Sequence, residues 1–181
     1  MQESAYGWNR WKYSAARQWL NSTQPKGKWW TKQDDWDIAP SQLDTKDGFL
    51  CGMPAEMLAV LKTVKVITLA NTVSDGGVTD ITYDKVFLAS MSQMNVNMSK
   101  EEGTVHEYWQ RRTNSKTPIE PWKTYPIMIR YSAANHTSPQ IVFSRSANRG
   151  NAGLVMYVFT SGGVGNAYAW YSYVYAPLVV V

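Results

Sequence analysis

The apolar positions near the start of the chain recur with the period of a helix. In residues 8–21, WNRWKYSAARQWLN, they stand three or four residues apart, at Trp8, Trp11, Ala15 and Trp19. This spacing places them along one face of an α-helix, which we expect to pack into the core. Ser14 is expected to cap the regular part of the helix, which should end before Pro25.

A second short helix is predicted for residues 53–62, MPAEMLAVLK. Pro54 suits its first turn, where a missing N–H costs nothing, and the pattern directs Met57, Leu58 and Leu61 inward. The polar segment before it, residues 31–48, carries five aspartates. These lack the regular alternating spacing of a calcium-binding loop, so a solvated loop is the better prediction.

The rest of the chain is predicted to form short strands separated by loops. Runs of β-branched, aromatic and other apolar residues predict strands at 64–71, 85–90, 127–133, 141–146, 154–160, 166–175 and 177–181. SDGG at 74–77 predicts a turn after the first strand, and residues 91–126, polar with three prolines, predict a long irregular segment. Helices followed by strands, with no repeat and no linker, predict one α+β domain over residues 1–181.

The C-terminal part of the chain is aromatic and uncharged. No Asp, Glu, Lys or Arg follows Arg149, and residues 166–175, NAYAWYSYVY, hold four tyrosines and a tryptophan. In a regular strand the aromatic residues would divide between two faces, with Tyr168 and Trp170 on one and Tyr171, Tyr173 and Tyr175 on the other. One face is expected to be core. The other is either core as well or a recognition surface, since Tyr, Trp, Ser, Gly and Asn are typical of paratopes.

Composition narrows the class of protein. With 44% hydrophobic and 18% charged residues the chain is globular, and no apolar run approaches the about 20 residues that span a bilayer. The net charge of +4 comes from scattered basic residues, whereas nucleic-acid binding calls for a dense basic stripe. The first residues lack a basic segment followed by an apolar core, so we expect no signal peptide. The single cysteine, Cys51, has apolar neighbours, which favours a buried structural thiol.

The sequence contains no arrangement typical of an active site or a metal site. Its two histidines, His106 and His136, each stand alone in a polar segment without a Cys or His at ligand spacing. There is no G-x-S-x-G nucleophile motif, and SGGVG at 161–165 is expected to be a hairpin turn because strands flank it. We therefore expect a protein that is not an enzyme and holds neither metal nor cofactor.

The order of several short motifs resembles a known family. SAARQWLN (14–21), GFLCGMPAE (48–56), DKVFLAS (84–90), IRYSA (129–133) and the C-terminal FSRSANRG, YVFTSGG and AYAWYSYVYAP follow one another as in C-type-lectin-fold domains of gut bacteria and their bacteriophages. Many of those are variable proteins of diversity-generating retroelements. The resemblance implies a C-type lectin fold, with two short helices packed on small antiparallel sheets and long irregular loops. It also implies a ligand-binding or receptor-binding function.

In that family the C-terminal part is rewritten by error-prone reverse transcription at adenines, so that Asn codons are the favoured targets. The resemblance implies a hypervariable region at about residues 145–175, with a framework of Arg145, Ser146, Asn148, Arg149, Val158, Ser161, Gly162, Ala169, Ala176 and Pro177. The positions implied for variation are Asn151, Gly153, Tyr157, Phe159, Gly163, Gly165, Asn166, Tyr168, Tyr171 and Tyr173. Trp170 and Met156 depart from this scheme, because changing adenines in an Asn codon produces neither.

The residues expected to bind the ligand are Asn151, Gly153, Tyr157, Phe159, Asn166, Tyr168, Trp170, Tyr171 and Tyr173. The aromatic members would supply contact area, and the asparagines would set orientation through hydrogen bonds. The partner that the resemblance implies is a protein or glycan on a cell surface, and the location is a phage tail or a bacterial surface. Neither nucleic acid nor membrane insertion is expected.

Two other interpretations use the same residues. A carbohydrate-binding module of fixed specificity would stack sugars on these aromatic side chains, and a purely structural domain would bury them. Formylglycine-generating enzymes have a related fold but rely on paired cysteines, which Cys51 alone does not supply. Calcium-dependent sugar binding is not expected either, because the Glu-Pro-Asn and Gln-Pro-Asp signatures are absent. Fold alone would not decide between these functions.

Overall fold

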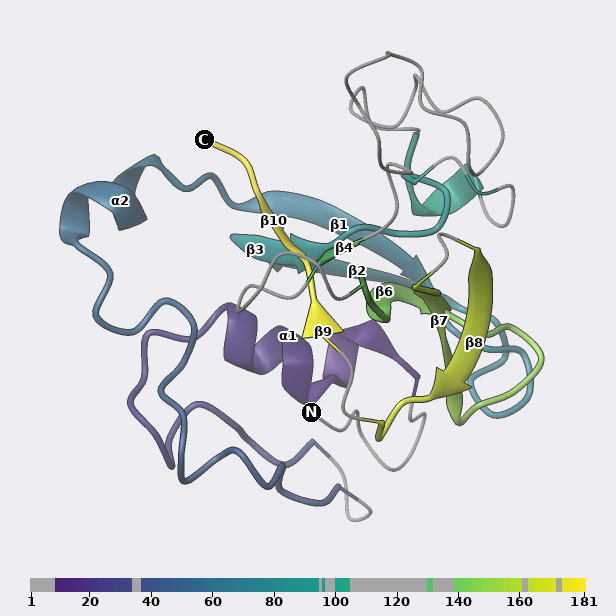
Figure 1. The fold of residues 1–181 in the computed structure, drawn as a ribbon, viewed down its shortest axis with the longest axis horizontal. Coiled ribbons are helices and arrows are strands. Elements are labelled where there is room, and N and C mark those ends of the chain that lie inside the picture. Colours follow the sequence, from purple (N-terminus) through teal and green to yellow (C-terminus); the bar gives the residue numbers. More distant parts are fainter. Residues whose placement is uncertain are drawn as a thin grey trace.

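The structure, a computed structural model, describes residues 9–33, 37–94, 96, 100–104, 130–131, 139–160, 163–171 and 174–181. Its helices are η1 (Trp11–Tyr13) and η2 (Lys100–Glu102), both single 3₁₀ turns, and α1 (Ala15–Leu20) and α2 (Ala55–Val60). Its strands are β1 (Val64–Leu69), β2 (Thr79–Asp84), β3 (Val86–Leu88), β4 (Arg130–Tyr131), β5 (Pro139–Gln140), β6 (Val142–Ala147), β7 (Leu154–Val158), β8 (Val164–Tyr168), β9 (Val174–Tyr175) and β10 (Pro177–Val179). The protein is an α+β domain in which sheet predominates (Figure 1).

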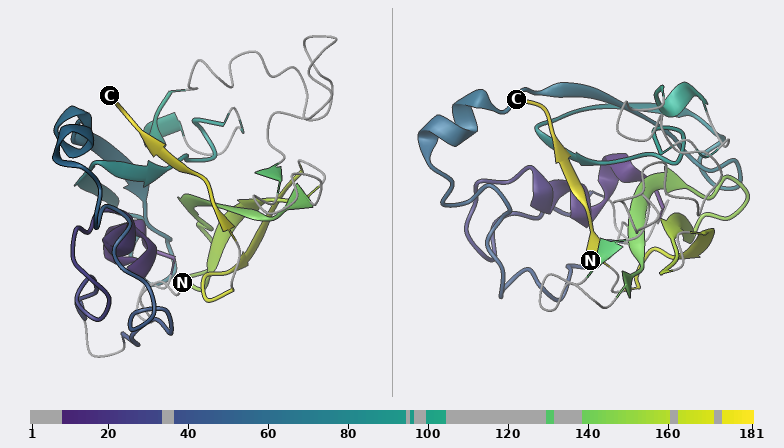
Figure 2. Two further views of the ribbon diagram at one scale, coloured as in Figure 1. Left: turned by 60° about the vertical axis from the view of Figure 1, so that its left-hand side comes forward. Right: turned by 45° about the horizontal axis from the view of Figure 1, so that its top comes forward.

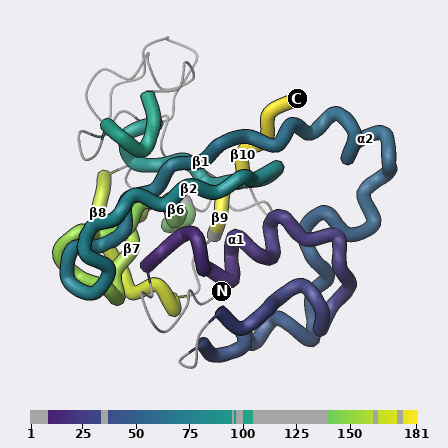
Figure 3. Tube along the Cα trace, turned by 180° about the vertical axis from the view of Figure 1, so that it is seen from behind, coloured from purple at the N-terminus to yellow at the C-terminus, as the bar shows by residue number. Residues whose placement is uncertain are grey.

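The described strands form four small sheets. β1 pairs with β2, β3 with β10 and β4 with β5, each antiparallel. The fourth sheet has the order β8-β7-β6-β9, in which β9 is parallel to β6 and the other pairs are antiparallel. Figure 2 shows β10 crossing the molecule to reach β3, so the end of the chain is tied to its middle. β8 and α2 lie at opposite ends of the molecule (Figures 1 and 3).

The N-terminal apolar stripe forms the predicted helix in two pieces. Trp11 opens η1, and α1 begins directly after Ser14. The Ser14 hydroxyl accepts a hydrogen bond from the N–H of Arg17 at 3.0 Å, so its prediction as the cap is confirmed. Trp11 and Ala15 are buried as expected, and Trp8 lies outside the described residues.

The second helix is present, but the inward direction predicted for Met57 is wrong. None of the residues of α2 is buried, and the helix stands at the edge of the molecule (Figure 1). Leu58, and Leu61 just beyond the helix, pack against the main core, whereas Met57 is 53% exposed. A six-residue helix that meets the core on so narrow a face leaves the rest of its apolar side chains to solvent.

The hydrophobic pattern does not predict β2, yet this segment forms a regular strand with inverted polarity. Polar side chains point inward and apolar ones outward, with Asp80, Thr82 and Asp84 buried and Ile81 and Tyr83 exposed. Arg10 donates to both carboxylate oxygens of Asp80, and Arg17 donates to Asp84 at 2.7 Å. Charged partners therefore fill the inner side of this strand where apolar side chains would normally lie.

The turn predicted at 74–77 is confirmed and joins β1 to β2. Gly76 and Gly77 have φ of +62° and +67°, values that residues with a side chain rarely adopt. A Cβ on Gly77 would also lie 2.9 Å from an Nη atom of Arg149. The connection between β1 and β2 also holds the loop between β6 and β7, because the N–H of Thr72, just before the turn, donates to the carbonyl of Arg149 at 2.8 Å.

The single strand predicted for residues 166–175 is wrong. β8 ends at Tyr168 and the chain turns at Trp170, with the N–H of Tyr171 bonded to the carbonyl of Tyr168 at 3.0 Å. The chain then returns as β9, in which Tyr175 is half-buried against the core of the four-stranded sheet. The aromatic run is thus divided between a surface turn and the core.

The other predicted strands correspond to β1, β3, β6, β7 and β10. Of the segment 127–133 the structure describes only β4, and most of the irregular segment 91–126 lies outside the described residues, as do both histidines. The described parts of the 31–48 loop contain neither helix nor strand. Cys51 is half-buried rather than buried, and it lies in the turn before α2 between the buried Leu50 and the exposed Gly52.

A buried guanidinium joins the four-stranded sheet to the rest of the molecule. Arg145 of β6 is 2% exposed, and its two Nη atoms donate to the carbonyls of Leu88 and Glu102, each at 2.6 Å. Burial lowers the pKa of Arg145 to about 10, although the negative charge of Glu102 acts in the opposite direction. One side chain of β6 thereby fastens the end of β3 and η2.

The carboxylate of Glu102 lies in the same buried network. It accepts hydrogen bonds from the N–H of Leu69 at 3.0 Å and from the hydroxyl of Ser146. Burial raises the pKa of Glu102, and the two hydrogen bonds and the charge of Arg145 only partly offset this effect. The folded state therefore holds the Glu102 proton more tightly than the unfolded chain does.

The raised pKa of Glu102 predicts a pH dependence of stability. The stabilisation that protonated Glu102 contributes is fully present below the pKa of the unfolded chain, about 4.5. It is lost as pH rises through the higher pKa of the folded protein. Glu102→Gln cannot titrate and keeps an oxygen for the N–H of Leu69. We expect its unfolding free energy, relative to the original protein, to increase from about pH 4 to about pH 7. Urea titrations of both proteins across this range would check it, and a difference independent of pH would contradict it.

Candidate ligand-binding surface

Three aromatic side chains gather where β8 ends. Tyr168, Trp170 and Tyr171, here called the aromatic patch, are 42%, 38% and 42% exposed. The rings of Tyr168 and Trp170 stack with centroids 4.2 Å apart and planes 16° apart. Tyr171 meets both in T-shaped contacts at 5.7 and 6.4 Å. Each ring contacts the other two, so the three form one continuous surface. Stacked and T-shaped arrangements are both favourable for aromatic pairs, which stabilises this cluster.

The turn after β8 creates this arrangement. Ala169 is buried, and its N–H donates to the carbonyl of Gly153 at 3.0 Å. With Ala169 held inward, Trp170 stacks on Tyr168, and the hydrogen bond from Tyr171 back to Tyr168 brings the third ring to the same place. A regular strand would have put Tyr171 on the opposite face, so that prediction is wrong.

Two predicted asparagines lie close to the aromatic patch along the backbone. Asn166 is exposed and shares its face of β8 with Tyr168, two residues further on. Asn151 is exposed in the loop between β6 and β7, residues 148–153, and its side-chain oxygen accepts from the N–H of Gly153 at 2.9 Å. Since Gly153 also bonds to Ala169, this loop is attached directly to the turn that carries the patch.

The remaining predicted site residues do not join the patch. Tyr157 is 7% exposed and belongs to the core, and Gly153 is buried. Phe159 is exposed, but it contacts Tyr157 at the other end of the β7–β8 hairpin, on the face opposite to Tyr168. Tyr173 lies outside the described residues. The aromatic patch and the asparagines near it therefore include fewer residues than the binding site predicted from the sequence.

Gly165 leaves the space that the Phe159 ring occupies. A Cβ at this position would lie 2.6 Å from Cε2 of Phe159 and 3.2 Å from Cζ of the buried Tyr157. We expect Gly165→Ala to lower the unfolding free energy by about 1 kcal/mol and to push the exposed Phe159 ring away from Tyr157. Urea unfolding and NMR contacts between the two rings would check this, and an intact T-shaped pair would contradict it.

The aromatic patch belongs to a part of the chain without charged side chains, since none occurs in residues 150–181. This part of the chain therefore supplies aromatic surface and hydrogen-bonding groups but no charge of its own. Among the described residues, no group of three or more His, Cys, Asp or Glu side chains is placed to hold a metal ion. The helices in the described part of the chain are all too short or too polar to cross a membrane.

The sequence gives no sign of two residues that shape this surface. Asn9 and Asn71 are fully buried and bond to each other at 3.0 Å between Nδ2 of Asn71 and Oδ1 of Asn9. Asn9 also donates to carbonyls of the 148–153 loop and of Leu154, which follows it. Asn9 carries no local signal of such a role, because the carbonyls it binds are more than a hundred residues away, and Asn71 carries none because Asn9 is 62 residues from it.

The fold and the surface define a small α+β domain that presents a cluster of aromatic side chains where one strand ends. The chain belongs to the family described as a domain of unknown function (DUF6273), whose model matches residues 1–178. No curated protein and no solved structure matches it. The family match covers the aromatic patch and all the secondary structure up to β10.

Proposed function

We propose that this protein binds a ligand through the aromatic patch. The observation that carries the proposal is that Tyr168, Trp170 and Tyr171 stay exposed while contacting one another. Stacked tyrosine and tryptophan rings offer a large contact area and lose little conformational freedom on binding. Asn166 beside them supplies hydrogen-bonding groups that would orient the ligand. The ligand is a protein or glycan on a cell surface.

The scaffold in this proposal is a C-type lectin fold, and the surface is diversified by a retroelement. What supports it is the motif order noted above and the division of the C-terminal region into two kinds of position. Arg145, Ser146, Val158 and Ala169, implied as framework, are buried, whereas Asn151, Asn166, Tyr168 and Tyr171, implied as variable, are exposed. The division holds for only part of the region, because Gly153 and Tyr157, implied as variable, are buried and Pro177, implied as framework, is exposed. A phage tail or a bacterial surface is the setting in which such a binder would act.

The genome that encodes the protein tests the diversification. We expect a reverse-transcriptase gene nearby, with a near-copy of the 3′ end of this gene that differs only at adenines. Sequencing of the gene across a population should then show changes at the codons for Asn151, Asn166, Tyr168 and Tyr171, and none at Arg145. A gene without such a copy, identical in every isolate, would rule diversification out but would leave ligand binding open.

A carbohydrate-binding module of fixed specificity is the second candidate. The near-parallel rings of Tyr168 and Trp170, 16° apart, favour it, because a flat exposed aromatic face suits stacking against a sugar ring. A glycan array separates the two candidates. Reproducible binding to one class of polysaccharide, lost in Trp170→Ala, supports the module, whereas no glycan binding together with binding to a cell-surface protein excludes it.

A further inference from the structure

The loop between β6 and β7, residues 148–153, is held at several carbonyls by one buried side chain, in addition to the bonds from Thr72 to the carbonyl of Arg149. Nδ2 of Asn9 donates to the carbonyls of Asn148 at 3.0 Å, Asn151 at 2.7 Å and Leu154 at 2.7 Å. The backbone N–H of Asn9 adds a bond to the carbonyl of Ala152 at 3.1 Å. An amide has two donor hydrogens, so three acceptors share them and enclose the nitrogen.

The orientation of the Asn9 amide is set by a second asparagine. Oδ1 of Asn9 accepts from Nδ2 of Asn71, which also donates to Asp75 at 2.6 Å. Oδ1 of Asn71 in turn accepts from the N–H groups of Val73 and Ser74, so Asn71 cannot flip without losing them. The Asn9 nitrogen must therefore face the loop.

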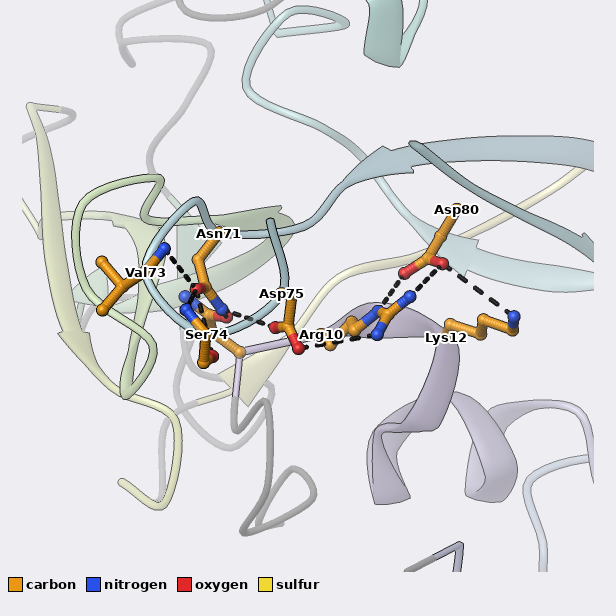
Figure 4. A network of polar contacts seen from close by, with 8 residues as sticks. Arg10, Lys12, Asn71, Val73, Ser74, Asp75 and Asp80 are labelled. Carbon is orange, nitrogen blue, oxygen red and sulfur yellow. Dashed lines mark hydrogen bonds and ion pairs between the residues drawn. The ribbon is translucent and has the colours of Figure 1, made fainter. Parts of the chain in front are cut away.

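This network is anchored to the body of the domain by ion pairs. Asp75 lies 3.5 Å from Arg10, and Arg10 binds both oxygens of Asp80 on β2, at 2.6 and 2.8 Å (Figure 4). The side chains of Asp75 and Asp80 are each 4% exposed, so solvent screens these contacts poorly. β2 thus holds Arg10 in place, and Asn9, the residue before Arg10, holds the 148–153 loop.

The loop leads directly to the aromatic patch. The carbonyl of Gly153 accepts from the N–H of Ala169, between Tyr168 and Trp170. Leu154, whose carbonyl binds Asn9, is the register partner of Tyr168. A shift of the loop would therefore move the backbone on which two of the three rings are mounted.

We infer that Asn9 and Asn71 are positioning residues for the aromatic patch, acting on the main chain alone. Every bond from Asn9 to the loop ends on a carbonyl, so the clamp does not depend on which side chains the loop carries. Two bonds inside the loop do depend on side chains, from the N–H of Gly150 to Asn148 and from the N–H of Gly153 to Asn151, and both could be lost while the Asn9 bonds remain. That the protein exploits this independence to vary its loop and patch side chains rests on the proposed function. The positioning of the patch by Asn9 and Asn71 does not.

Hydrogen exchange tests the positioning, with a matched control. Asn21 also makes four bonds to backbone groups, to Arg17, Lys85 and Val86, far from the loop. We expect Asn9→Ala to lower protection of the Gly153, Leu154 and Ala169 amides by about tenfold or more beyond its effect on global stability. Asn21→Ala should lower the protection of these three amides only as much as it lowers the protection of the whole domain. The same loss in both variants would show that Asn9 has a merely structural role.

A displayed library tests the tolerance without any ligand. Positions 151, 152, 166, 168 and 171 are randomised in the original background, in Asn9→Ala and in Asn21→Ala, and protease resistance measures the folded fraction. We expect about tenfold fewer resistant sequences with Asn9→Ala than with Asn21→Ala. Equal fractions of protease-resistant sequences in the Asn9→Ala and Asn21→Ala libraries would overturn the inference. Since no ligand is used, a library that folds as expected but never binds would count against the proposed function alone.

Discussion

Replacing Tyr168, Trp170 and Tyr171 together by alanine is expected to abolish ligand binding and leave the fold intact. Central aromatic anchors are commonly worth about 2 kcal/mol or more each, so losing three should weaken binding by about a thousandfold or more. The rings are more than a third exposed, so their loss should cost little stability. Binding is measured to intact bacterial cells and purified polysaccharides that retain the original protein, and folding by thermal unfolding.

A matched triple variant controls this experiment. Ile81, Tyr83 and Val78 are more exposed than the patch residues, at 46%, 66% and 46%, and lie on β2 and directly before it rather than at the end of β8. Their replacement by alanine removes exposed apolar surface and should not change binding. If the patch variant instead loses its cooperative unfolding transition, the three rings are structural, and the proposed function fails.

Arg145→Met is expected to lower the unfolding free energy by about 3–5 kcal/mol, a large part of the about 5–15 kcal/mol typical of a domain. The carbonyls of Leu88 and Glu102 lose their donor in a place that water does not reach, and the Glu102 carboxylate loses its nearby positive charge. Urea unfolding followed by far-UV circular dichroism measures the loss.

Lys65→Met is the control for this substitution. Lys65 is an exposed residue of β1, and the same change of a cation for an apolar chain should alter stability there by less than about 0.5 kcal/mol. Equal stabilities of the two variants would show that Arg145 does not join the sheet to β3 and η2. A large difference would establish it as the residue on which the arrangement of these segments depends.

The candidate site was only partly predictable, and Tyr157 shows why. Along β7 both faces are covered, because Met156 packs toward Met91 while Tyr157 packs toward Phe143. Alternation distinguishes inside from outside only where one face of a strand meets water. That Tyr168 and Trp170 lie on the same face was predictable from their spacing, but their exposure was not, and the approach of Tyr171 required the turn at Ala169.

The sequence by itself determined the α+β class, both helices, most strands and an uncharged aromatic C-terminal region, because these depend on local periodicity and composition. Only the tertiary structure decided that β2 is a strand with carboxylates inside, that three rings meet at one turn, and that Asn9 holds the loop beside them. The first and the last of these depend on a polar group finding its partner far along the chain, as Asn9 does with the carbonyl of Asn148, 139 residues away. The meeting of the rings depends on a turn held by the backbone of the neighbouring strand. A local pattern shows which side chains favour burial, but the fold decides which polar groups are satisfied there.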